Sequence, residues 1–150
     1  MKQKQDPAGP GESSRTLSVD IAASPAAPSI ARSAVSGLAA EHPGAASHLD
    51  ALALLVSEVV TNAILHVDPP GRQVELEINV TDERTRVDVR DQGQGFGARS
   101  EHPAGSREGG FGLRLVEQAA SRWGSGMNEG RFSVWFEIDH TRRPGESAGA

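Results

Sequence analysis

Alternation of polar and apolar residues predicts four β-strands along the chain. The alternation covers residues 16–21, 74–80, 86–91 and 132–138, and a period of two is typical of a strand with one buried face. Residues 82–84 form a turn between the second and third strands, which predicts an antiparallel hairpin. The first strand is expected at an edge of the sheet.

Apolar residues at helical spacing predict three helices, over residues 25–42, 47–67 and 112–122. Ser24 and Pro25 form an N-terminal start signal for the first helix, and Pro43-Gly44 ends it. The second helix has the widest apolar arc and must cover a sheet. Residues 124–130 are predicted as a turn region, with a short strand as the alternative.

Composition divides the chain into one folded domain and two polar ends. Residues 1–14 and 140–150 are too polar to offset their ordering entropy, so we expect a disordered leader, a domain over 15–139 and a mobile tail. A length of 150 residues fits a single domain. Residues 92–110 are rich in glycine and lack apolar periodicity, which is typical of a functional lid or a disordered loop.

Charge and residue usage exclude several classes of function. The net charge of −5 gives no basic field for nucleic acid or anionic lipid, so neither is an expected partner. No cysteine is present, which excludes thiol chemistry, and no apolar run is long enough for a membrane helix. A cytoplasmic location is expected. Lysine occurs only at Lys2 and Lys4, so a P-loop is excluded and any phosphate-binding cation must be arginine.

The second helix carries three polar residues beside its apolar arc. Glu58, Asn62 and His66 are spaced four residues apart, so they lie on one edge of the helix. A glutamate there is a candidate general base, and an amide oxygen is a candidate Mg²⁺ ligand. The alternative is a solvated polar stripe, with His66 interacting with the last carbonyls of the helix.

Asp91-Gln92-Gly93-Gln94-Gly95-Phe96 begins where the third strand ends. The strand period places Asp91 on the same face as the buried valines, where its carboxylate could accept a hydrogen bond from an exocyclic amine such as that of adenine. Gly93 and Gly95 allow a backbone to approach a planar ligand closely. The alternative is a turn that closes the hairpin. A dinucleotide-binding fold is rejected because no helix can begin at this glycine-rich segment.

Gly109-Gly110-Phe111-Gly112 leads directly into the third helix. Free amides at a helix N-terminus, together with the helix dipole, form a site for phosphate. The alternative is a flexible loop that meets a helix. Arg99, Arg107 and Arg114 are candidate cations nearby, or solvated surface charges.

Taken together, these segments resemble the histidine-kinase-like ATPase superfamily. Residues 57–66 are similar to its N box, Asp91-x-Gly93-x-Gly95-Phe96 to its first glycine box, and Gly110-x-Gly112-Leu113 to its second. The likeness covers residues 17–138. Small size and the segments around Arg122-Trp123-Gly124 and Val134-Trp135 are similar to stand-alone anti-sigma-factor serine/threonine kinases.

The resemblance implies a two-layer α/β sandwich, with helices on one face of a mixed, mostly antiparallel sheet, that binds ATP and Mg²⁺. It implies Glu58 as general base, Asn62 as Mg²⁺ ligand and Asp91 as acceptor for the adenine amine. The partners implied are an anti-anti-sigma protein, phosphorylated on serine or threonine, and a sigma factor; a homodimer is expected. The further nucleotide-binding residues implied are His66, Gly93, Gly95, Phe96, Gly109, Gly110, Phe111, Gly112 and Leu113.

Two alternatives remain open at the level of sequence. The same motifs fit an ATP-gated binding module that sequesters a partner without phosphotransfer. They also fit the ATPase part of a split histidine kinase, which would need a separate phosphoacceptor protein. The chain departs from the family pattern at Gly97-Ala98 after the first glycine box, and at Ser121, where an acidic residue is common.

Overall fold

A computed structural model describes residues 2–4, 13–65, 72–91, 111–128 and 130–141. Within these ranges the chain forms strands and helices in an order that matches an α/β domain. The elements are β1 (Lys2–Lys4), β2 (Arg15–Ala22), α1 (Ala27–Ala40), α2 (Pro43–Ala46), α3 (Leu49–Leu65), β3 (Gln73–Val80), β4 (Arg84–Asp91), α4 (Phe111–Ala119), β5 (Arg122–Asn128) and β6 (Arg131–Asp139).

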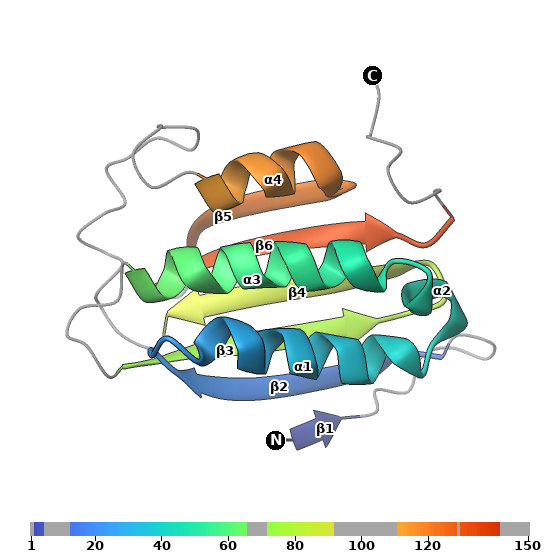
Figure 1. Ribbon diagram of the computed structural model, residues 1–150, viewed down its shortest axis with the longest axis horizontal. Coiled ribbons are helices and arrows are strands. Elements are labelled where there is room, and N and C mark those ends of the chain that lie inside the picture. The colour runs from blue at the N-terminus through green and yellow to red at the C-terminus, as the bar shows by residue number, and fades with distance from the viewer. Residues whose placement is uncertain (1, 5–12, 66–71, 92–110, 129, 142–150) are drawn as a thin grey trace.

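The strands form one sheet in the order β1-β2-β3-β4-β6-β5. Every described pair of neighbours is antiparallel, so this sheet has no parallel pairing. Figure 1 shows α1, α3 and α4 side by side on one face, with α3 between the other two. The predicted two-layer α/β sandwich is therefore confirmed, with a fully antiparallel described sheet.

The hairpin of β3 and β4 fixes which residues enter the core. Val74 pairs with Asp91 and Val80 with Thr85, so alternate positions of both strands face the helices together. Leu76 and Ile78 are fully buried on this face. The helices close the other side of the core with a continuous apolar layer from α3, made of Leu52, Leu55, Val56, Val59, Val60 and Ala63.

The N-terminal region differs from expectation at two points. Residues 1 and 5–12 of the leader that was expected to be disordered over 1–14 lie outside the described residues, and for them the expectation stays a prediction. Lys2–Lys4, within the same leader, pair with β2 in a register that sets Gln3 opposite Leu17. β2 is for the same reason the second strand of the sheet and not its edge. The segment of β1 is polar and does not alternate, so its sequence gives no strand signal. It forms a strand because the edge of β2 offers unpaired backbone groups.

The helix boundaries differ from the predicted ones for identifiable reasons. α1 begins at Ala27, because a start at Pro25 would place Pro28 where a helical N–H is needed and proline has none. The predicted break at Pro43 is instead the start of a one-turn helix, α2. α4 ends at Ala119 and not at Arg122, because Arg122 begins β5. β5 corresponds to the strand that was the alternative to a turn over residues 124–130, and it begins two residues earlier. None of the described helices is long and apolar enough to cross a membrane.

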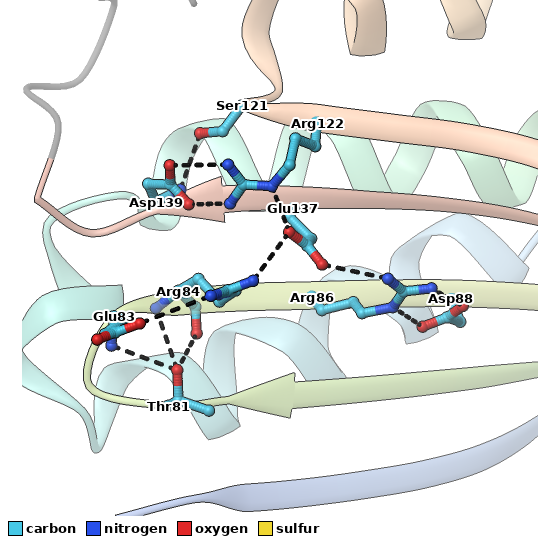
Figure 2. A network of polar contacts seen from close by, with 9 residues as sticks. All are labelled: Thr81, Glu83, Arg84, Arg86, Asp88, Ser121, Arg122, Glu137 and Asp139. Atoms are coloured by element: carbon cyan, nitrogen blue, oxygen red, sulfur yellow. Dashed lines mark hydrogen bonds and ion pairs between the residues drawn. The ribbon is translucent and has the colours of Figure 1, made fainter. Parts of the chain in front are cut away.

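The sheet face away from the helices carries a network of charged side chains (Figure 2). Glu137 on β6 is only 6% exposed and accepts hydrogen bonds from three arginines. Burial alone would raise the pKa of Glu137, but the hydrogen bonds from Arg122 and Arg86 and the charges of Arg122 and Arg84 together outweigh burial and lower it. This face is therefore stabilised by paired charges rather than by a second layer of helices.

Candidate functional site

The polar edge of α3 lies where the sequence predicts it. Glu58 and Asn62 are both half-buried, between the buried arc and the exposed side of the helix. Ser57 accepts a hydrogen bond from Arg32 of α1 at 2.9 Å, which marks the edge of α3 that faces α1. Helical geometry places Asn62 on the opposite edge, with Glu58 next to it, and Figure 1 shows α4 on that side.

Asp91 is the last residue of β4 and is fully buried. Its strand position puts the carboxylate on the helix-covered face, as the alternation of Val87 and Val89 predicts. A carboxylate at such a depth requires hydrogen-bonding partners, whether from the protein or from a ligand. The predicted placement of this candidate residue is confirmed, and its role remains a prediction.

The third candidate segment begins a helix, as the sequence predicts. α4 starts at Phe111 and includes Gly112 and Leu113 in its first turn. The first amides of a helix have no partner within it and are available to an anion.

Figure 1 shows that these three features lie at one end of the molecule. At this end lie the C-terminal ends of α3 and β4 and the N-terminal end of α4. Contacts of α3 with both β4 and α4 hold these elements together. A polar helix edge, a buried carboxylate and a helix N-terminus are therefore assembled from segments far apart in the sequence.

Several candidate residues lie outside the described residues. They are His66, Gly93, Gly95, Phe96, Gly109 and Gly110, and the predicted lid over 92–110 lies there too. Their contribution to the site stays a prediction.

Sequence reasoning missed one residue beside the site, Arg131. Its Nε donates a hydrogen bond of 2.8 Å to the backbone carbonyl of Asp91. An arginine in the first position of a strand carries no pattern that marks it as part of a site. The contact depends on the register of β4 and β6, which ends with Arg90 opposite Ser133 and which the sequence alone does not define.

A model of the histidine kinase-like ATPase domain matches residues 21–132, which is most of the chain. The chain belongs to this family. It contains a histidine kinase-like ATPase domain, and the matched range contains every candidate residue discussed above. No curated protein matches the chain.

The described part of the site is compatible with Mg²⁺-bound ATP. Within the described ranges, no group of three or more His, Cys, Asp or Glu side chains is placed to hold a metal ion. A Mg²⁺ ion that bridges nucleotide phosphates needs no such group, because it keeps several waters and takes one or two oxygens from the protein. The amide oxygen of Asn62 is suited to that purpose.

Proposed function

We propose that this chain is a Mg²⁺-ATP-dependent protein serine/threonine kinase that also acts as an anti-sigma regulator. The observation that supports the proposal is that the C-terminal end of α3, the end of β4 and the start of α4 lie at one end of the molecule, in a domain of the histidine kinase-like ATPase family. Small size and the segments around Arg122-Trp123-Gly124 and Val134-Trp135 carry the resemblance to stand-alone anti-sigma kinases. The proposed acceptor is a serine or threonine hydroxyl of an anti-anti-sigma protein.

Glu58 is proposed to act as the general base. The acceptor hydroxyl oxygen forms a bond to the γ-phosphorus of ATP, the bond from that phosphorus to the bridging oxygen of ADP breaks, and Glu58 takes the hydroxyl proton. Half-burial of Glu58 leaves its carboxylate beside the core and still accessible to a substrate hydroxyl.

The other residues of the site bind and orient the nucleotide. Asn62 supplies an oxygen to Mg²⁺, which neutralises charge on the phosphates when bound. The buried carboxylate of Asp91 accepts a hydrogen bond from the adenine amine, and the first amides of α4 stabilise negative charge on the phosphates. In this proposal Asp91 recognises the base, and Asn62 and the first amides of α4 stabilise the phosphates.

Nucleotide state is proposed to select the partner. With ATP bound the protein phosphorylates the anti-anti-sigma protein, and once that partner is phosphorylated the protein holds a sigma factor inactive. A homodimer is part of the same proposal, since the resemblance to anti-sigma kinases implies one. A cytoplasmic location is proposed from the residue usage of the chain, which has no cysteine.

Transfer of γ-labelled phosphate from Mg²⁺-ATP tests this function. The acceptors are small proteins of the sulfate-transporter and anti-sigma-antagonist type from the same organism. Glu58→Gln should bind ATP and lose transfer, because its amide cannot take the proton. Asp50→Asn, an acidic residue in the first turn of the same helix, is the matched control and should transfer normally.

Each outcome of this assay assigns a function. Acid-stable label that is absent with Glu58→Gln would establish the kinase and identify its acceptor. Acid-labile label would indicate transfer to histidine and a split histidine kinase. Intact ATP binding without transfer to any candidate would contradict the kinase and favour an ATP-gated binding module.

A further inference from the structure

Arg131 connects three strands at the end of the sheet where Asp91 lies. On β6, its Nε donates to the carbonyl oxygen of Asp91 on β4 at 2.8 Å, and its guanidinium also contacts Glu75 on β3 at 3.4 Å. Its side chain is 33% exposed and that of Glu75 is 25% exposed, so the contacts are partly shielded from water. The N–H donors of a guanidinium group lie in one plane, which suits Arg131 to bind the Asp91 carbonyl and the Glu75 carboxylate at once.

The register explains why a side chain is used at this place. The ladder between β4 and β6 ends with Arg90 opposite Ser133, one residue before Asp91. Beyond that pair, the Arg131 side chain supplies a hydrogen-bond donor to the next carbonyl. Asp91 pairs with Val74 of β3 on one side, and the contact with Arg131 extends the restraint to its other side, where the pairing with β6 has ended.

Glu75 holds the guanidinium in position. Its carboxylate accepts a hydrogen bond from Arg90 at 2.9 Å as well as the contact from Arg131, so it lies between two arginines. All three side chains lie on the sheet face away from the helices. Arg131 is for that reason on the opposite face from the Asp91 carboxylate.

We infer that Arg131 is a positioning residue that aims the Asp91 carboxylate by holding its backbone carbonyl. The inference rests on the proposed role of Asp91 as acceptor for the adenine amine. Arg131 does not contact the base, and its effect passes through the peptide of Asp91. Loss of the contact lets the end of β4 move and weakens a hydrogen bond that depends on direction.

This role predicts a defect in base selection rather than a general loss of affinity. Inosine triphosphate is the probe, because its base carries a carbonyl oxygen where adenine carries the amine, and an oxygen cannot donate to Asp91. A site built to bond an amine rejects such an analogue. The wild-type chain should bind Mg²⁺-ATP at least about ten-fold more tightly than Mg²⁺-inosine triphosphate.

The experiment measures both dissociation constants by calorimetry for the wild-type chain, Arg131→Ala and Arg131→Lys, with urea unfolding of each. Arg131→Ala should reduce the preference for ATP by about five-fold or more, with little change for inosine triphosphate. Arg131→Lys keeps the charge beside Glu75 but lacks the planar fork, so it should restore the preference only in part. Arg122 lies on β5, on the same face of the sheet and beside the other end of β6, so Arg122→Ala should keep the wild-type preference.

Two results would overturn the inference, and they are distinguishable. If the wild-type chain prefers ATP and both Arg131 variants keep that preference, Arg131 has only a structural role, whatever the change in unfolding free energy. If the wild-type chain binds neither nucleotide or shows no preference, the proposed role of Asp91 fails and the inference fails with it.

Discussion

Two aspartates of β4 lie three residues apart and meet opposite environments, because a strand alternates its faces. Asp88 is 6% exposed on the open face and pairs with Arg86 at 2.8 Å. Asp91 is fully buried on the helix-covered face. The sequence predicted the position of Asp91 from the neighbouring valines. It could not predict the contact with Arg131, which depends on where the chain returns 40 residues later.

Replacing Asp91 by asparagine tests its proposed role against this neighbour. Asp91→Asn should weaken Mg²⁺-ATP binding by about 1.5–3 kcal/mol, because one charge-assisted hydrogen bond to the adenine amine is lost. Asp88→Asn makes the same chemical change on the other face of the same strand and should leave ATP affinity unchanged. Titration calorimetry measures both. Equal ATP affinity for Asp91→Asn and the wild-type chain would contradict the adenine contact.

Gly124 shows a residue choice that only the fold explains. A Cβ at this position would lie 2.8 Å from Nε1 of Trp135 on the neighbouring strand. The indole of Trp135 also lies under the guanidinium of Arg86, 4.2 Å from the ring centroid. In the sequence, Gly124 and Gly126 indicate a turn, whereas in the structure they belong to β5. The reason is the space that a tryptophan across the ladder requires.

Alanine at the two glycines should therefore have different effects. Gly124→Ala should lower the free energy of unfolding by about 1–3 kcal/mol, because the Trp135 ring must shift. Gly126→Ala places its Cβ where nothing lies within 4 Å, so its effect should stay within about 0.5 kcal/mol. Urea unfolding followed by tryptophan fluorescence compares them. Similar unfolding free energies for the two variants would show that Trp135 does not pack on β5 in solution.

At the scale of elements, strong periodicity predicted which helices and strands exist, whereas tertiary contacts determine the residues at which they begin and end. The apolar arc of α3 and the alternation of β3 predicted both elements closely. β5 was missed as a definite strand because its pairing with β6 and the ion pairs of Arg122 with Glu137 and Asp139 are long-range. β1 was missed because its pairing partner, and not its own sequence, determines it.

The junction of α2, the β3–β4 turn and the end of β6 contains a cluster of histidines. The ring of His140 lies 5.5 Å from that of His42 and 6.1 Å from that of His48, measured between centroids. Its Nε2 lies 2.7 Å from the hydroxyl of Thr85. Burial, together with repulsion from the other two histidines, lowers the pKa of His140 below its ordinary value of 6.5.

This shift predicts a pH dependence of stability with a definite sign. Below pH 6.5 the unfolded chain binds a proton at His140 more readily than the folded chain, so the free energy of unfolding falls as the pH decreases. His140→Gln should reduce this slope, because glutamine has no proton to gain. Urea unfolding at several pH values between about 7.5 and 5 measures it. Equal slopes for the wild-type chain and the variant would show that His140 is not responsible.

At the scale of the whole molecule, the two faces of one sheet have separate tasks. The helix-covered face provides the core and, at one end, the candidate nucleotide site (Figure 1). The open face provides a charged network that ties β4, β5 and β6 together (Figure 2). Arg131 links the two tasks, since it belongs to the open face and holds the residue that enters the site.

Amide chemical shifts on titration with Mg²⁺-ATP test most directly where the nucleotide binds. The proposed nucleotide site predicts the largest changes in the C-terminal half of α3, at the end of β4 and in the first turn of α4, which meet at one end of the sheet. Residues of α2 and the β3–β4 turn, at the opposite end, should change little. Saturable changes centred on that opposite end, or none at millimolar Mg²⁺-ATP, would contradict the proposed site.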